Sequence, residues 1–349
     1  MPDELRLTLA FGVGLGAALI TVPLAIRLAW RTGFLDYPVG YKKHAVPTPC
    51  LGGLAVMLAF LPACVLLGGG ASQFGVIVVC ALGLSIVGAV DDRVGLGPVP
   101  RVVAEVAAAT ALWDAGLAWH VSDSETLNLV AAIVWVVGVV NAFNLMDNLD
   151  GAAGTVGAVS AAGAGALAAV EGEILLAALA LSLSGACAGF LPFNLSRPAR
   201  IFLGDGGSMP VGFIVAAAVM ESSKQAELGQ AVVVAAVLFV GLPALDTALV
   251  VVSRTRRGTT VFSGARDHVT HRLLWRLRTP RAVALALGLT QAALCLLGLA
   301  LFQTTSAAVF AVGTIYVILG CAVIIRLESS YGAEAAPAVA APAQPEPGS

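Results

Sequence analysis

Long apolar runs recur along the whole of this 349-residue chain. A helix needs about 20 mostly apolar residues to cross a membrane. Eleven segments approach or exceed that length: 5–30, 51–68, 74–90, 101–119, 127–143, 152–170, 173–191, 208–222, 230–252, 283–303 and 306–326. Segment 101–119 is weakened by Glu105 and Asp114, and segment 208–222 is short. The expected fold is therefore all-α, a polytopic membrane protein of eleven transmembrane helices.

The composition excludes an ordinary soluble domain. Hydrophobic residues make up 58% of the chain and charged residues only 11%, with a mean hydropathy of +0.92. A net charge of −2 predicts no nucleic-acid partner. We expect a single transmembrane catalytic domain over 1–328, followed by a disordered tail over 329–349 that is rich in Ala, Pro and Gly.

Basic residues predict the orientation of the chain in the membrane. If the N-terminus lies outside and the eleven segments alternate in direction, 17 of the 19 Lys and Arg residues fall on the inner side. Only Arg6 and Lys224 fall outside. Removing either weak segment would destroy this asymmetry, which therefore favours eleven spans with the C-terminus in the cytoplasm.

A dense polar stretch lies between two apolar runs at Asn141–Gly154, which reads N-A-F-N-L-M-D-N-L-D-G-A-A-G. An ionisable side chain at the centre of a membrane helix costs about 2.5–3.5 kcal/mol, so this density indicates a functional site. The other polar clusters fall on the same cytoplasmic side: Asp36–Pro49, Asp91–Asp92, Asn194–Ser208 and Arg254–Arg281. A site on one face favours an enzyme with a cytoplasmic substrate over an ion-coupled transporter, which needs polar groups near the midplane.

Carboxylates on this face predict a metal site. Converging carboxylates repel one another unless a cation joins them, and their oxygen atoms suit Mg²⁺, with Mn²⁺ as the alternative. The carboxylates are Asp91, Asp92, Asp147, Asp150 and Asp205. Their basic neighbours are Lys42, Lys43, Arg266, His268, His271 and Arg272. Together these groups favour the handling of a diphosphate, and a helix beginning beside Asp205 would offer free amides to phosphate oxygens.

Five stretches in the same order resemble the polyprenyl-phosphate N-acetylhexosamine-1-phosphate transferase family. They read D-Y-P-V-G-Y-K-K-H-A-V-P-T-P from Asp36, V-D-D-R-V-G from Val90, N-A-F-N-L-M-D-N-L-D-G from Asn141, P-F-N-L-S-R-P-A-R-I-F-L-G-D-G-G-S from Pro192, and A-R-D-H-V-T-H-R-L from Ala265. The chain departs from the family motifs at four positions. Tyr41 replaces an Arg, Asn148 a Gly, Ala265 an Asp and Thr270 a His.

The resemblance implies transfer of a sugar 1-phosphate, by default GlcNAc-1-phosphate, from a UDP-sugar to polyprenyl phosphate, with release of UMP. It also implies roles for individual residues. Catalytic work falls to Asp91, Asp92, Asp147 and His268, and metal binding to Asp205 and Asn144. Substrate binding falls to Lys42, His44, Asp150, Asn194, His271 and Arg272. Whether Asp147 is a nucleophile in two steps or an orienting acceptor in one step is left open.

The expected partners are a UDP-N-acetylhexosamine, a polyprenyl phosphate lipid and the membrane, and a homodimer is left open. The expected location is the plasma membrane, with several spans and the active site facing the cytoplasm. The sibling reading, a phospho-N-acetylmuramoyl-pentapeptide transferase, is less favoured because the last motif reads H-V-T-H rather than a denser histidine run. A CDP-alcohol phosphotransferase fails because no Arg follows Asp150–Gly151 at the required spacing.

Two further acidic residues have simpler interpretations. Asp246, within segment 230–252, is expected to satisfy neighbouring backbone groups. Glu105 is expected to pair with Arg101, one helical turn earlier.

Overall fold

The computed structural model describes residues 1–37, 46–66, 74–224, 229–260 and 265–335. Lys42 and His44, both predicted to bind substrate, lie outside these ranges. The last helix continues to Ala335, inside the segment predicted as a tail, and 336–349 lie outside the described residues. The division into one domain and a tail stays a prediction.

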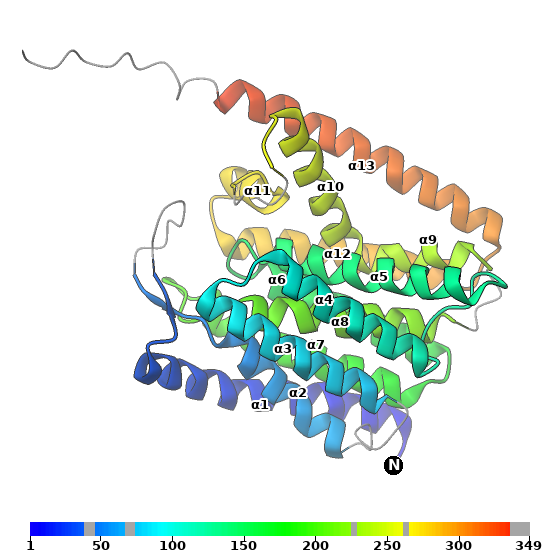
Figure 1. Ribbon diagram of the computed structural model, residues 1–349, viewed down its shortest axis with the longest axis horizontal. Helices are drawn as coiled ribbons and strands as arrows, with labels where there is room; N and C mark the ends of the chain where they lie inside the picture. The colour runs from blue at the N-terminus through cyan, green and yellow to red at the C-terminus, as the bar shows by residue number, and fades with distance from the viewer. Residues whose placement is uncertain (38–45, 67–73, 225–228, 261–264, 336–349) are drawn as a thin grey trace, which may run out of the picture.

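Helices dominate the described chain, as the apolar runs predict (Figure 1). The first eight are α1 (Asp3–Thr32), α2 (Gly52–Leu66), α3 (Gly75–Val94), α4 (Pro98–Asp114), α5 (Glu125–Met146), α6 (Ala152–Val170), α7 (Ile174–Asn194) and α8 (Asp205–Ser222). The later helices are α9 (Ala231–Val237), the 3₁₀ turn η2 (Leu238–Val240), α10 (Gly241–Arg256), α11 (Val269–Leu277), α12 (Pro280–Leu301) and α13 (Ser306–Ala335). Two short strands, β1 (Leu35–Asp36) and β2 (Thr48–Pro49), pair antiparallel.

Each of the eleven apolar segments coincides with a helix, the ninth being divided into α9, η2 and α10. In the described part of the chain, eight helices are long and apolar enough to cross a membrane. The protein is therefore an all-α, multi-pass membrane protein. The total of eleven spans and the outside N-terminus stay predictions.

Helix α8 lies at the centre of the bundle and explains why its segment looked weak. It packs against α2, α3, α5, α6 and α7, and Gly206–Ser222 are all buried. A helix enclosed by other helices needs small residues for close packing more than it needs a strongly apolar surface. Its short apolar run thus goes with a position away from lipid.

The polar connections meet at one end of the bundle, because consecutive long helices alternate in direction. The C-terminal ends of α1 and α3 are joined there by Arg93, whose Nη1 donates to the Gly33 carbonyl at 2.6 Å. At the opposite end, Trp119 Nε1 donates to Ser223 Oγ at 2.8 Å. This arrangement agrees with the predicted collection of polar motifs on one face.

The ninth segment bends at η2, and α10 leaves the direction of the bundle toward α13 (Figure 1). Buried Gln291 of α12 stabilises this bend. Its Nε2 donates to the carbonyls of Leu238 (3.1 Å) and Phe239 (2.8 Å), and its Oε1 accepts from the Leu242 amide (3.1 Å). Backbone groups in an apolar environment must form their hydrogen bonds within the protein. The Gln291 side chain supplies the hydrogen bonds that the backbone loses at the bend.

Candidate active site

The site begins where the segment before α8 runs beside the segment before α2. The Phe202 amide donates to the Pro49 carbonyl at 2.8 Å, and the Gly53 amide donates to the Leu203 carbonyl at 2.8 Å. Gly204 then turns the chain with φ of 70°, a conformation that glycine adopts without strain. Asp205 is thereby placed as the first residue of α8, at the polar end of the bundle.

Glycine also lets α3 approach this turn closely. A Cβ on Gly88 would lie 2.3 Å from the carbonyl of Asp205, so a larger residue does not fit. The close approach brings the Asp92 carboxylate to the start of α8, where it accepts from the amides of Asp205 (3.0 Å) and Gly206 (3.1 Å). A carboxylate is stabilised at a helix N-terminus. The expectation of free amides for phosphate at this position is therefore wrong, because Asp92 already occupies them.

Asp205 is the centre of a group that we call the carboxylate cluster: Asp91, Asp92, Asp147 and Asp205 with Arg101 and Asn144. Arg101 Nη1 lies 2.6 Å from Asp205 Oδ2 and 3.0 Å from Asp91 Oδ2. Asn144 Nδ2 donates to the other oxygen of Asp205 at 2.7 Å and lies 3.1 Å from Ser208 Oγ. The structure thus brings together residues from α3, α4, α5 and α8, and Arg101 meets Asp205 across 104 positions of sequence.

Asp147 follows the last residue of α5, and its Oδ2 accepts from the Gly204 amide at 3.0 Å. Burial raises the pKa of Asp147 well above its ordinary value, and the nearby charges of Asp205 and Asp92 raise it further. Protonation of Asp147, or a cation close to the cluster, would reduce this electrostatic cost.

The cluster fits a hard divalent cation by its chemistry. All its candidate ligand atoms are oxygens, the type that Mg²⁺ and Mn²⁺ prefer. Asp91 Oδ1 is buried and has no hydrogen-bond partner among the described residues. No group of three or more His, Cys, Asp or Glu in those residues is arranged as a finished metal site. The Arg101 guanidinium instead bridges two of the carboxylates.

Glu105 corrects one expectation from sequence. Its carboxylate is buried and accepts from Asn141 Nδ2 at 2.5 Å, whereas Arg101 pairs with Asp91 and Asp205. The predicted Glu105–Arg101 pair is therefore wrong, because the α4–α5 contact offers Glu105 an amide partner.

His268 and His271 lie in a second group, the histidine cluster, together with Asp246, Arg254 and Asp267. His268 Nδ1 lies 2.8 Å from Asp246 Oδ2, and the Val269 amide donates to Asp246 Oδ1 at 2.7 Å. The expectation that Asp246 satisfies a backbone group is confirmed, and it also orients His268. Asp267 is held by Arg254 at 3.1 Å.

The charges of this second cluster follow from burial and pairing. Burial acts to raise the pKa of Asp267, but the hydrogen bond and positive charge of Arg254 outweigh it and hold the pKa below its ordinary value. Burial lowers the pKa of His271 to about 4, and His268 contributes to the shift. His271 is therefore a neutral imidazole near pH 7.

Arg272 is buried and bonded on several sides. Its Nη2 lies 2.5 Å from Glu328 Oε1 and 3.1 Å from Ser253 Oγ, and its Nε donates to the Asp267 carbonyl at 2.9 Å. These bonds fasten α11 to α10 and α13. The predicted contact of Arg272 with the sugar stays a prediction beside this structural one.

Asn194 and Asp150 lie next to the carboxylate cluster. Asn194 is buried, with Oδ1 accepting from the Gly151 amide at 2.6 Å and Nδ2 donating to the Ile201 carbonyl at 2.9 Å. It therefore holds the α5–α6 turn against the strand-like segment that leads to Asp205. Its predicted contact with nucleotide stays a prediction.

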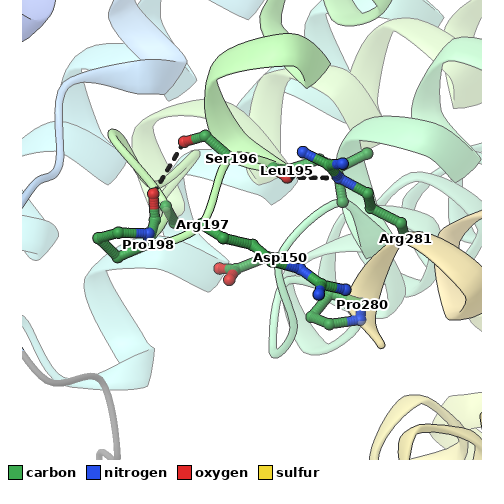
Figure 2. A pocket seen from close by; sticks show the side chains of 8 residues that line it. Asp150, Leu195, Ser196, Arg197, Pro198, Pro280 and Arg281 are labelled. Atoms are coloured by element: carbon green, nitrogen blue, oxygen red, sulfur yellow. Dashed lines mark hydrogen bonds between the residues drawn. The ribbon is translucent and has the colours of Figure 1, made fainter. Parts of the chain in front are cut away.

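Asp150 lines a pocket of about 210 Å³ with Arg197 and Arg281, shown in Figure 2. Arg281 Nε donates to the Leu195 carbonyl at 3.0 Å and so closes one wall. Ligand pockets usually measure about 300–1,000 Å³, so this one is too small to enclose a whole drug-sized ligand.

The predicted site residues thus fall into two groups. Asp91, Asp92, Asn144, Asp147 and Asp205 meet in the carboxylate cluster, and Asp150 and Asn194 border it. His268, His271 and Arg272 lie on or beside α11. Their individual roles stay predictions.

Sequence reasoning missed the bridging position of Arg101 and the pairing of Asp267. The run G-P-V-P-R at 97–101, which opens α4, held a signal, because it places a cation in the first turn of a helix that follows Asp91–Asp92.

Comparison with known proteins gives a family and several relatives. The model of glycosyl transferase family 4 matches residues 74–223, which include the carboxylate cluster. The chain is similar to decaprenyl-phosphate N-acetylglucosaminephosphotransferase of Mycobacterium tuberculosis (strain CDC 1551 / Oshkosh), 33% identical over 318 residues that cover 78% of each chain. It is also similar to the probable undecaprenyl-phosphate N-acetylglucosaminyl 1-phosphate transferase of Bacillus subtilis (strain 168), 26% identical over 78% of this chain and 79% of the relative. A Salmonella typhi undecaprenyl-phosphate alpha-N-acetylglucosaminyl 1-phosphate transferase is 27% identical over 72% of each chain.

Proposed function

Because this chain belongs to glycosyl transferase family 4, we propose that it transfers N-acetylglucosamine 1-phosphate from UDP-GlcNAc to a polyprenyl phosphate and releases UMP. The chain is an enzyme of the phosphotransferase type. Its relatives carry names that specify decaprenyl or undecaprenyl phosphate as the acceptor. These names favour transfer of N-acetylglucosamine 1-phosphate over transfer of a phospho-muramoyl pentapeptide, and they favour an enzyme over a transporter.

The observation that carries the proposal is the carboxylate cluster at the start of α8. Four carboxylates from α3, the α5–α6 turn and α8 converge with Asn144 and Arg101. Both substrates of the proposed reaction are anions. A site that binds them needs positive charge. The carboxylates can provide it by binding a metal ion, and Arg101 already supplies part of it.

Asp205 and Asn144 would hold the cation, for which we propose Mg²⁺, with Mn²⁺ as the alternative. Asp205 and Asn144 are linked at 2.7 Å, and Asp91 offers a buried oxygen without a partner among the described residues. A bound Mg²⁺ would neutralise the diphosphate and stabilise the departing UMP. Arg101 can turn from these carboxylates to a substrate phosphate.

In this geometry Asp92 has a positioning role. It fixes the start of α8, and through it the direction of Asp205. Asp91 is the candidate to orient the lipid phosphate or accept its proton, and Asp147 is the candidate nucleophile or orienting acceptor. Asp150, Lys42, His44 and Asn194 are proposed for the nucleotide portion.

His268, His271 and Arg272 are proposed for the sugar portion of the donor. As a neutral imidazole, His271 can both donate and accept a hydrogen bond, as recognition of a sugar requires. Asp246 orients His268 by accepting from its Nδ1.

We place the protein in the plasma membrane with both clusters facing the cytoplasm, where a UDP-sugar is made available. The asymmetry of basic residues supports this orientation. A reporter fused after Gly172 should read outside and one fused after Gly258 should read cytoplasmic. The homodimer stays a prediction.

The test is a panel of UDP-sugars with polyprenyl phosphate and Mg²⁺, using purified protein and scoring UMP and a lipid-linked product. UDP-GlcNAc should give both products, and UDP-MurNAc-pentapeptide should give neither. Comparable turnover of the pentapeptide donor would move the protein to the sibling activity, and failure of all donors would refute the proposed function.

A further inference from the structure

One hydrogen bond joins the turn between α5 and α6, which borders the carboxylate cluster, to α11, which borders the histidine cluster. Thr270, the second residue of α11, donates from Oγ1 to Oδ1 of Asn148 in the turn between α5 and α6. Asn148 lies between Asp147 and Asp150, and Thr270 lies between His268 and His271. The bond therefore connects the turn that carries Asp147 and Asp150 with α11, which contains His271 and directly follows His268.

The direction of this bond is determined by the other contacts of Asn148. Its Nδ2 lies 2.5 Å from the Leu145 carbonyl, which can only accept a hydrogen bond. The amide oxygen must then face Thr270, whose hydroxyl donates. Asn148 thus uses one end of its amide on α5 and the other end on α11.

Thr270 is fully buried, so its hydroxyl is held inside the protein and is not offered to a substrate. A buried hydroxyl without a partner is costly, which gives the pair a preferred geometry. On its other sides, α11 is fastened to α10 by Asp246 and to α13 by Glu328. The Asn148 contact adds a connection on the side of the carboxylate cluster.

Both positions are also departures from the family motifs described above, which have Gly where Asn148 stands and His where Thr270 stands. A Gly at 148 has no side chain that could accept from Thr270. A larger imidazole at 270 would compete with Asn148 for the same space. The two departures are therefore complementary in hydrogen bonding and in volume.

The geometry points to Asn148 and Thr270 as a positioning pair. The pair sets the distance between α11 and the turn between α5 and α6, and so aligns the nucleotide sugar between these two elements. This inference rests on the proposed function, because the donor is assigned to Asp150 on one side and to His271 on the other. The pair acts through these neighbours and does not touch the reacting atoms.

The test is a double-mutant cycle on purified protein with steady-state kinetics for both substrates. Thr270→Val and Asn148→Ala should each lower kcat/KM for UDP-GlcNAc about three- to tenfold, the effect of one lost neutral hydrogen bond. The KM for polyprenyl phosphate should stay within about twofold, because the lipid phosphate is assigned to Asp91 of α3, which lies on neither element. The double variant should lose no more than either single variant.

Two controls separate positioning from general damage. Thr270→Ser retains the hydroxyl and should keep kcat/KM close to that of the wild type. Thr247→Val removes a hydroxyl that bonds only one turn back to the Pro243 carbonyl at 2.9 Å, and it should leave both substrates unaffected.

Three results would overturn the inference. They are an unchanged kcat/KM for UDP-GlcNAc in both single variants, single-variant losses in kcat/KM that multiply in the double variant, or a KM for polyprenyl phosphate that rises as much as the KM for UDP-GlcNAc. Wild-type protein that makes no product would refute the proposed function and this inference with it. Active wild type with unaffected variants would refute the inference alone.

Discussion

Asp205→Asn gives the strongest test of the carboxylate cluster. The change keeps the shape of the side chain and removes its charge. In the protein, Asp205 pairs with Arg101 at 2.6 Å and accepts from Asn144 at 2.7 Å. Both side chains of the ion pair are 24% exposed, so its loss should cost only about 0–1 kcal/mol of folding free energy. The variant should therefore be extracted in detergent as a folded protein.

The effect on turnover should be far larger. A metal ion contributes several kcal/mol of charge stabilisation to such a reaction. If Asp205→Asn removes about 3 kcal/mol of it, turnover falls about 150-fold, since each 1.36 kcal/mol is a factor of ten. The Mg²⁺ concentration for half-maximal activity should rise as well.

The assay is UMP release at a series of Mg²⁺ concentrations, together with Mn²⁺ binding measured by electron paramagnetic resonance without substrates. Asp114→Asn is the matched control, because Asp114 is exposed at the far end of α4 and the chemical change is the same. Near-normal turnover of Asp205→Asn with an unchanged Mg²⁺ midpoint would show that the cation is bound elsewhere.

Three further predictions follow from the same contacts. Arg101→Ala removes the guanidinium that competes with a cation for Asp205, so Mn²⁺ should bind about two- to fivefold more tightly in the absence of substrates; weaker binding would contradict this. Glu328→Ala removes the carboxylate that lies 2.5 Å from the buried Arg272 guanidinium and should lower the free energy of unfolding by about 3–5 kcal/mol, seen as a lower melting temperature in detergent; an unchanged melting temperature would refute it. Asp267 has a lowered pKa, so its stabilisation is fully present above its ordinary value of 3.8 and is lost as pH falls through the lower, folded-state pKa. The difference in melting temperature between wild type and Asp267→Asn should therefore be constant above about pH 5 and shrink in stronger acid. A difference that grows in acid would contradict the lowered pKa of Asp267.

The helices and the convergence of the carboxylates could be predicted from the sequence for a physical reason. Apolar runs of spanning length must form helices in lipid, and short connections force neighbouring helices to alternate. Asp91, Asp147 and Asp205 each lie where such a run begins or ends, so they had to reach the same face. The central position of α8 was not visible, because a short apolar run is compatible both with a helix enclosed by protein and with a weak membrane span.

Partner choice within the site could not be predicted. Arg101 is four residues from Glu105 on one helix, yet it pairs across the bundle with Asp91 and Asp205. The contact between Asp246 and His268 depends on how α10 meets α11. Such contacts are set by the close approach of helices at glycines such as Gly88, and a linear pattern does not encode that approach.

The bend at η2 has a consequence for how the protein is made. Leu238 and Phe239 leave the ribosome 53 and 52 residues before Gln291, the side chain that satisfies their carbonyls. Chain synthesis proceeds from the N-terminus, so the ninth segment reaches the membrane before its partner exists. In lipid, open carbonyls cost several kcal/mol each, and a straight helix closes them internally. We expect the segment to insert straight and to acquire its bend only when α12 docks, which makes shaping of this part of the enzyme a late step in biogenesis.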